Sequence, residues 1–189
     1  MDRRPGALSS APAPAPADAL RALSDLGISA AYLQQRGLRL YEQARELVLA
    51  DMGADGREFR LTPTAARAWQ AMQRAAAAEG VTLVLESAYR SVARQVEILQ
   101  AKLAAGQPLA EVLLWVAPPG CSEHHTGCAV DIGTPGSAAL EEEFETTTAF
   151  AWLRSHASQH GYRMSFPRGN AQGYSHEPWH WCHQEPGGG

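Results

Sequence analysis

Apolar residues with helical spacing fill the longer segments of this sequence, whereas the β-branched, apolar runs typical of strands are short. The pattern predicts four helices, each with one buried face, over residues 40–48, 63–79, 91–105 and 148–160. It predicts strands over residues 81–89, 129–133, 162–166 and 179–183, the first of them central and mostly buried. Because helices come first and the later strands are joined by short loops, we expect an α+β fold, a small, mainly antiparallel sheet covered by helices.

The length of the chain, 189 residues, suits one core of ordinary size. We predict a single domain over residues 19–185, preceded by a disordered Ala/Pro-rich tail at 1–18 and followed by a frayed C-terminus at 186–189. Prolines between residues 12 and 16 interrupt the window that would form the apolar part of a secretory signal. We therefore expect a cytoplasmic protein, or a periplasmic or extracytoplasmic one if a native leader precedes this sequence.

The charge of the chain excludes some partners. Sixteen Lys and Arg face 20 Asp and Glu, a net charge of −4, so the basic surplus of a nucleic-acid-binding surface is missing. No apolar run approaches the length that spans a bilayer, so we expect no membrane span. Three cysteines, an odd number, fit a reducing compartment. We expect a monomer without nucleic-acid partners.

Histidines gather in two short windows. Five of the seven fall within residues 124–125 and 176–183. The first window precedes the predicted strand at 129–133, in which side-chain alternation places Asp131 on the less apolar face. A turn between window and strand lets His124 fold back toward the carboxylate of Asp131.

The second window supplies another histidine for the same face. In a strand that begins at about residue 179, His180 faces opposite to Trp179 and Trp181. His180 can then face Asp131 and His124 if the two strands are neighbours. Two imidazoles and one carboxylate with an open fourth position are the ligand set of a catalytic zinc. The sequence therefore predicts one Zn²⁺ per chain, bound by these three residues.

A second carboxylate, Glu177, lies three residues before His180 and is available as a general base. Bound zinc lowers the pKa of water to about 7, and a nearby carboxylate can take the proton as that water attacks a carbonyl. This combination predicts hydrolysis of an amide.

The remaining polar residues of the two windows have simpler interpretations. His125 and His176 are rim residues, or groups that orient the ligands or the substrate, and His183 has no assigned role. The cysteines at 121, 128 and 182 are expected to be small buried thiols. Cys182 shares the strand face of His180, so it could instead approach the metal.

Three motifs occur in this sequence: Ser122-x-His124-x-x-Gly127-x-Ala129-x-Asp131, then Glu177-Pro178-Trp179-His180, and upstream Ser87-Ala88-Tyr89-Arg90-Ser91 with Gln95. Together they resemble the zinc D,D-peptidases of the VanY/VanX group, the LAS metallopeptidases. The resemblance covers residues 61–184 and is greater to the VanY-like carboxypeptidases than to the dipeptidases. It implies the LAS metallopeptidase type of α+β fold.

The resemblance also implies roles for individual residues. The predicted ligands would bind zinc, and Glu177 would be the base that later protonates the leaving amine. Arg90 would hold the scissile carbonyl oxygen and stabilise the oxyanion, a task suited to a fixed cation. The implied substrate-binding residues are Ser122, Gln95, Tyr89 and Trp179. Ser122 and Gln95 would lie near the terminal carboxylate of the substrate or the adjoining backbone.

The predicted function is a zinc D,D-carboxypeptidase that removes the C-terminal D-alanine from peptidoglycan precursor or stem peptides. An L,D-carboxypeptidase and a D-Ala-D-Ala dipeptidase are alternatives, because loops that shape the pocket decide between them. A non-catalytic zinc-containing binder of cell-wall peptides is a further alternative, although binding needs neither Glu177 nor Arg90. A purely structural zinc site would need a fourth protein ligand, such as Cys182.

Overall fold

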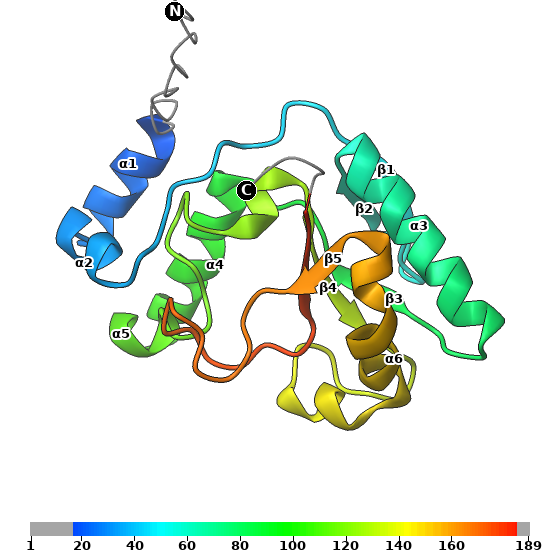
Figure 1. The fold of residues 1–189 in the computed structure, drawn as a ribbon. Coiled ribbons are helices and arrows are strands. Elements are labelled where there is room, and N and C mark those ends of the chain that lie inside the picture. The colour runs from blue at the N-terminus through cyan, green and yellow to red at the C-terminus, as the bar shows by residue number, and fades with distance from the viewer. Residues whose placement is uncertain (1–16, 185–189) are drawn as a thin grey trace, which may run out of the picture.

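The computed structural model describes residues 17–184. Its helices are α1 (Ala17–Asp25), α2 (Ala30–Gln35), α3 (Pro63–Ala78), α4 (Val92–Ala104), α5 (Leu109–Val112) and α6 (Thr148–His156). Its strands are β1 (Val48–Met52), β2 (Glu58–Leu61), β3 (Val84–Ser87), β4 (Ala129–Gly133), β5 (Tyr162–Met164) and β6 (His180–His183). Short 3₁₀ turns are η1 (Glu123–Thr126), η2 (Glu142–Thr146) and η3 (Ala157–His160). Figure 1 shows their arrangement.

The main sheet has four antiparallel strands in the order β3-β4-β6-β5, and β1 and β2 form a separate antiparallel pair. The predicted α+β class with a small antiparallel sheet is therefore confirmed. The prediction that residues 81–89 form a central strand is wrong, because β3 lies at the edge of the sheet. Leu83 and Leu85 are buried in the same cluster as Trp69 and Met72 of α3, so a helix buries this strand where a second neighbouring strand was expected. The central pair is β4 and β6.

Two groups of helices lie on either side of the sheet in Figure 1. One buried cluster joins α3 and α6 to the sheet through residues such as Trp69, Leu153 and Ile132. A second cluster joins α1, α2, α4 and α5 through residues such as Leu23 and Leu99. The site described below lies where β4, β6 and the turn η1 meet.

Local capping explains why three predicted helices form. The side chains of Thr62, Ser91 and Thr147 accept hydrogen bonds from the first turns of α3, α4 and α6. α6 continues into η3 and ends at Gly161, whose φ of 76° suits glycine. The predictions for these three segments are confirmed.

The predicted helix over residues 40–48 is wrong. Residues 40–47 run as an irregular segment, and β1 begins at Val48. Their backbone bonds to the site loop: Tyr41 N–H donates to the Gly120 carbonyl at 2.7 Å, and Ala44 N–H donates to the His125 carbonyl at 2.8 Å. These long-range bonds replace the local bonds of a helix, and they anchor the segment against η1.

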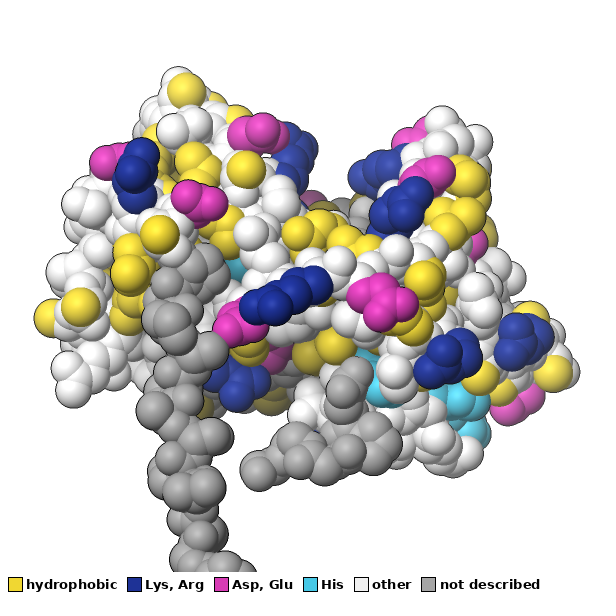
Figure 2. All heavy atoms as spheres, turned by 90° about the horizontal axis from the view of Figure 1, so that it is seen from above, with side chains coloured by type: hydrophobic (Ala, Val, Ile, Leu, Met, Phe, Trp, Pro, Cys, Tyr) yellow, Lys and Arg dark blue, Asp and Glu magenta, His cyan; other side chains and the backbone are white. Residues whose placement is uncertain are grey.

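The N-terminal region contains helices that were not predicted, α1 and α2, and the predicted tail at 1–18 overlaps α1 at Ala17 and Asp18. The rest of that tail and the frayed segment at 186–189 lie outside the described residues. In residues 17–184 no helix is both long and apolar enough to cross a bilayer. On the face shown in Figure 2, acidic and basic side chains are interspersed and form no extended basic patch.

Candidate metal centre

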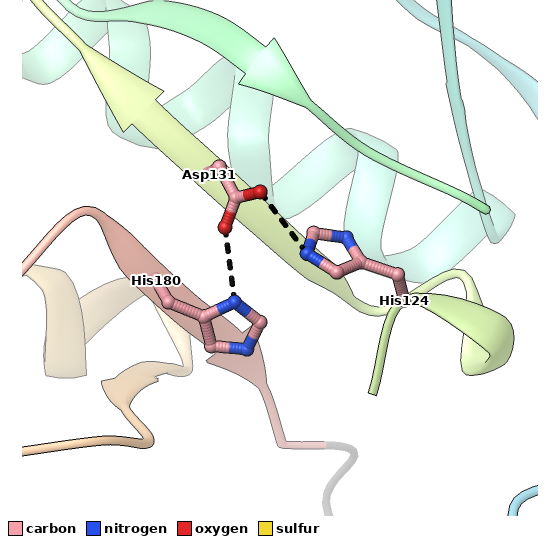
Figure 3. Close-up of side chains that lie close together, drawn as sticks. All are labelled: His124, Asp131 and His180. Atoms are coloured by element: carbon pink, nitrogen blue, oxygen red, sulfur yellow. Dashed lines mark hydrogen bonds and ion pairs between the residues drawn. The ribbon is translucent and has the colours of Figure 1, made fainter. Parts of the chain in front are cut away.

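The pairing of β4 with β6 sets Asp131 directly opposite His180. Residues that face each other across an antiparallel pair project to the same side of the sheet. His124 comes from η1, just before β4, and turns back toward the same carboxylate (Figure 3). Asp131 Oδ1 lies 3.0 Å from His180 Nδ1, and Oδ2 lies 3.1 Å from His124 Nε2. The three predicted ligands therefore lie together, with one ligand atom from each within 4.8 Å of the others.

Gly127 makes the reversal between η1 and β4 possible. It adopts φ +68°, the left-handed region that favours glycine. A Cβ at this position would lie 2.9 Å from Leu47 Cδ2 and 3.1 Å from Ala44 Cβ. The segment at 40–47 thus packs against the turn that presents His124.

The outer nitrogens of the imidazoles are held by acceptors. His124 Nδ1 donates to the Ala88 carbonyl at 2.7 Å, which leaves Nε2 with a lone pair toward Asp131. His180 Nε2 donates to Glu123 Oε2 at 3.0 Å, so Nδ1 is the atom that faces the group. Held outer nitrogens are typical of metal-binding histidines. Glu123 was not among the predicted site residues.

The electrostatics of the buried group suit a cation. Burial favours the neutral form of Asp131, but the imidazoles of His124 and His180 outweigh it and hold the pKa of Asp131 well below its usual range. Burial opposes charge on His180 as well, yet its hydrogen bonds to Asp131 and Glu123 raise its pKa to about 10. Without a metal, a proton on His180 offsets part of the negative charge of Asp131 and Glu123. Two imidazole nitrogens and a carboxylate oxygen are donors that zinc prefers.

Glu177 stands beside the group in a buried position. Its Oε2 lies 4.0 Å from His180 Nδ1, and the residue is 7% exposed. Burial, reinforced by the negative charges of Asp131 and Glu123, raises the pKa of Glu177 to about 7, against the opposing effects of His180 and Arg90. A carboxyl that gains and loses a proton near neutral pH suits general acid–base chemistry.

Arg90 is fixed by neighbours on two sides. Its Nη1 donates to Gln95 Oε1 at 3.0 Å, and its Nη2 donates to Ser87 Oγ at 3.1 Å and lies 3.6 Å from Asp131 Oδ2. Gln95 is fully buried and donates from Nε2 to the Ala117 carbonyl at 2.7 Å. The amide of Gln95 is therefore engaged at both ends, and its contact in this structure is with Arg90.

His125 links the backbone of Arg90 to that of Gly120. Its Nδ1 donates to the Arg90 carbonyl at 2.6 Å, and its Nε2 accepts from Gly120 N–H at 3.1 Å. Burial lowers the pKa of His125 to about 4, which keeps the ring neutral and both bonds intact. His176, the other flanking histidine, contacts Glu145 Oε2 at 2.9 Å through its Nε2.

A cavity of about 630 Å³ opens over the group. Predicted residues that line it include the three ligands with Arg90, Glu177, Ser122, Gln95 and Trp179. Tyr89 is not among the lining residues, and its hydroxyl instead lies 3.4 Å from Gln43 Oε1. The sequence analysis missed other lining residues, among them Trp115, Phe166 and Tyr174, because they come from loops without a distinctive pattern.

The cysteines remain outside the metal group. All three are free, and Cys121 and Cys182 are buried. Among the described residues, the group of potential ligands contains no thiol. Burial, together with the neighbouring Glu123, raises the pKa of Cys182 above its usual range, so the thiol stays protonated. The geometry therefore gives no support to Cys182 as a fourth ligand.

A buried His-Asp-His group that could hold a metal ion, a carboxyl of raised pKa and a fixed guanidinium line one cavity, an arrangement typical of the class of metal-dependent hydrolases. A sequence model narrows this class. The chain belongs to the VanY family, described as D-alanyl-D-alanine carboxypeptidase, whose model matches residues 58–185.

Curated relatives agree with this assignment. A D-alanyl-D-alanine carboxypeptidase of Enterococcus faecalis is 35% identical over 117 residues, which are 57% of this chain and 42% of that protein. The bifunctional D-Ala-D-Ala dipeptidase and carboxypeptidase VanXYC of Enterococcus gallinarum is 28% identical over 148 residues, 76% of each chain. The chain thus spans less than half the length of the first relative.

Solved structures share the fold. The LdcB LD-carboxypeptidase matches with a TM-score of 0.67 and 31% identity over 76% of this chain and 69% of that one. A mutant of the vancomycin-resistance D,D-pentapeptidase VanY in complex with Zn(II) matches with a TM-score of 0.57 and 30% identity over 73% and 78%. These neighbours confirm the expected LAS metallopeptidase type of fold.

Proposed function

We propose that this protein is a zinc-dependent D,D-carboxypeptidase that removes the C-terminal D-alanine from peptidoglycan precursor or stem peptides. The observation that carries the proposal is the buried group of His124, Asp131 and His180 with Glu177 beside it. Its donor set suits one zinc ion with an open coordination position. A VanY structure that binds Zn(II) supports the choice of metal.

In the proposed mechanism, the bound zinc would supply Lewis-acid activation of a water molecule and of the scissile carbonyl. Glu177 takes the proton from the nucleophilic water and passes it to the departing amine. Its pKa of about 7 in the metal-free protein suits both transfers. Arg90, held by Gln95 and Ser87, donates hydrogen bonds to the carbonyl oxygen as negative charge develops. The buried surroundings strengthen these interactions.

The size of the cavity supports a carboxypeptidase over a dipeptidase. A volume of about 630 Å³ lies in the middle of the range for pockets that enclose drug-sized ligands. The cavity extends from the metal group to Trp115 and Lys102, so it has room for residues that precede the scissile bond. We infer that the substrate is longer than a dipeptide.

An L,D-carboxypeptidase is the second candidate, because the LdcB LD-carboxypeptidase shares this fold at a TM-score of 0.67. Stem peptides of three, four and five residues, each incubated with the zinc-loaded protein, distinguish the candidates. We expect the pentapeptide to lose one D-alanine and stop at the tetrapeptide. Conversion of tetrapeptide to tripeptide would instead assign L,D activity, and cleavage of free D-Ala-D-Ala would assign dipeptidase activity.

Two variants test the roles of the site residues. Glu177→Ala should keep about one zinc per chain and lose turnover, because only the base is removed. His180→Ala should lose the metal. Unchanged turnover in Glu177→Ala would remove Glu177 from the mechanism. A stem peptide that is bound and never shortened by the zinc-loaded wild type would favour the non-catalytic binder.

We also propose that the protein is monomeric and acts in the cytoplasm on precursors or recycled fragments. Three free cysteines support a reducing compartment. Sedimentation equilibrium of the purified chain tests the first proposal, and fractionation of cells that express the native gene tests the second.

A further inference from the structure

Glu123 is a partly buried carboxylate whose contacts come from three distant parts of the chain. Its Oε2 accepts hydrogen bonds from His180 Nε2 at 3.0 Å and from Ser165 Oγ at 2.5 Å. Its Oε1 lies 3.4 Å from the Tyr41 hydroxyl. Only 16% of the side chain is exposed. A carboxylate with this many donors is fixed in one position.

The contact with His180 decides which nitrogen of the ring can bind a metal. In this hydrogen bond the carboxylate oxygen of Glu123 accepts, so the proton is on His180 Nε2. In a neutral imidazole the other nitrogen, Nδ1, then has the lone pair. Nδ1 is also the nitrogen that lies 3.0 Å from Asp131 Oδ1. When no metal is bound, Asp131 Oδ1 accepts from Nδ1 as Glu123 Oε2 accepts from Nε2. Once a metal takes Nδ1, the remaining proton is on Nε2, where Glu123 holds it.

The two histidines of the group differ in the strength of their outer contacts. His124 Nδ1 donates to a neutral backbone carbonyl, that of Ala88. His180 Nε2 donates to a charged acceptor, and such hydrogen bonds are about twice as strong as neutral ones. A carboxylate on the outer nitrogen also makes the imidazole a better electron donor to a metal.

We propose that Glu123 is the positioning residue of the metal centre: it holds the Nε2–H of His180 so that Nδ1 binds zinc. Glu123 lines the same cavity, and its contact with the metal group is made through His180. Ser165 and Tyr41 fix the Glu123 carboxylate in turn. The proposal rests on the zinc site of the proposed function and adds a residue outside the predicted set.

Zinc affinity, measured by competition with a chromophoric chelator, tests the proposal without any substrate. We expect Glu123→Ala to bind zinc about 10- to 100-fold more weakly, as is usual when the outer partner of a metal-binding histidine is removed. Glu123→Gln should retain most of the affinity, with a loss of less than about tenfold, because its amide oxygen still accepts from Nε2. A purely structural role would not produce this rescue.

Glu141→Gln is the matched control, because Glu141 lines the same cavity and carries the same charge, and among the described residues no hydrogen bond or ion pair joins its side chain to a histidine. Its zinc affinity should equal that of the wild type. Wild-type affinity in Glu123→Ala would overturn the proposal, and so would an equal loss in Glu123→Ala and Glu141→Gln.

If Glu123→Ala does not fold, the proposal is tested on the wild-type protein by nuclear magnetic resonance. Long-range ¹H–¹⁵N spectra of the zinc-loaded protein should show His180 protonated at Nε2 and metal-bound at Nδ1, and the opposite assignment would overturn the proposal. A protein that binds zinc as expected and cleaves no stem peptide would refute the proposed function and leave the role of Glu123 standing.

Discussion

The raised pKa of Glu177 has a consequence for stability that is measurable without substrate. In the metal-free protein, folded Glu177 keeps its proton up to about pH 7, whereas the unfolded carboxyl ionises near its ordinary value of 4.5. The unfolded state therefore binds fewer protons between these values, so this group lowers the free energy of unfolding as pH rises from 4.5 to 7. Above pH 7 the loss is complete, on the order of 3 kcal/mol.

Glu177→Gln should remove this dependence. As pH rises from 5 to 8, the free energy of unfolding of the variant should increase relative to that of the metal-free wild type. The increase should approach the wild-type loss, on the order of 3 kcal/mol. Denaturant unfolding at both pH values measures it. Glu97→Gln, which removes an exposed carboxylate paired with Arg94, is the control and should follow the wild type. Parallel pH profiles for Glu177→Gln and wild type would contradict the raised pKa.

Arg90 should not tolerate lysine. The planar guanidinium contacts Gln95 and Ser87 with two different nitrogens, a geometry that one ammonium group does not reproduce. We expect Arg90→Lys to keep its zinc and to lose about 100- to 1,000-fold in kcat, the usual cost of a lost oxyanion donor. Arg94→Lys, an exposed arginine on α4, should be unaffected. A kcat within threefold of the wild type would show that Arg90 does not stabilise the transition state.

At the residue scale, sequence reasoning found what alternation and local spacing encode. The period of two in β4 and β6 placed Asp131 and His180 on one face, and the structure pairs them directly. Glu123 gave no comparable signal, because its partner His180 lies in a strand far along the chain. Gln95 was predicted to lie near the substrate and lines the cavity. Its bonds to Arg90 and Ala117 gave no sequence signal, because they depend on how α4 packs.

At the scale of elements, the turn from η1 into β4 depends on a glycine for two separate reasons. Gly127 has φ +68°, and a Cβ there would also meet Leu47, Ala44 and Thr62 within 3.2 Å. Gly136 has φ +87° and nothing within 4 Å of the same position, so it offers the backbone effect alone. The two glycines form a matched pair.

Gly127→Ala should therefore lower the free energy of unfolding more than Gly136→Ala does. We expect a loss of about 1–2 kcal/mol in the free energy of unfolding for Gly136→Ala, from the left-handed backbone alone. Overpacking adds about 1–3 kcal/mol for Gly127→Ala. Denaturant unfolding of both variants and the wild type gives the difference. Equal losses of unfolding free energy in the two variants would show that residues 40–47 move away from the added Cβ without loss of stability.

Elements with local signals were predictable, and elements that depend on distant contacts were not. α3, α4 and α6 carry their own caps, so their starts could be read from Thr62, Ser91 and Thr147. Residues 40–47 have helical spacing, but their backbone bonds to Gly120 and His125, which no local pattern reveals. The edge position of β3 was hidden for a similar reason, because burial against a helix and burial between strands produce the same apolar run.

At the scale of the whole molecule, the region before the family match supports the site. Arg36 donates from Nε to the Gln172 carbonyl at 2.6 Å and from Nη1 to the Leu113 carbonyl at 2.8 Å. Its guanidinium also lies over the ring of Tyr174, a cavity-lining residue. The N-terminal segment thus ties two loops of the cavity wall together, although the family model begins at residue 58.

We expect bound zinc to stabilise the fold, and we expect the fold to persist when zinc is removed. Val130 and Ile132 of β4 and Trp181 of β6 belong to the larger apolar cluster, so apolar packing holds these two strands beside the metal group. The positive charge on His180 also offsets part of the negative charge of Asp131 and Glu123 when zinc is removed. We therefore expect chelation to leave the near- and far-ultraviolet circular dichroism of a folded protein and to lower the Tm.

Zinc that binds only the folded state should restore the lost stability by mass action. The gain is about 2.7 kcal/mol when free zinc is 100 times its Kd, and it grows with the logarithm of zinc concentration. Thermal unfolding at a series of buffered zinc concentrations measures it. His180→Ala is the control, and its Tm should not respond to zinc in this range. Loss of tertiary structure on chelation would mean that the metal organises the fold, because the two apolar clusters would then be insufficient to hold β4 and β6 together.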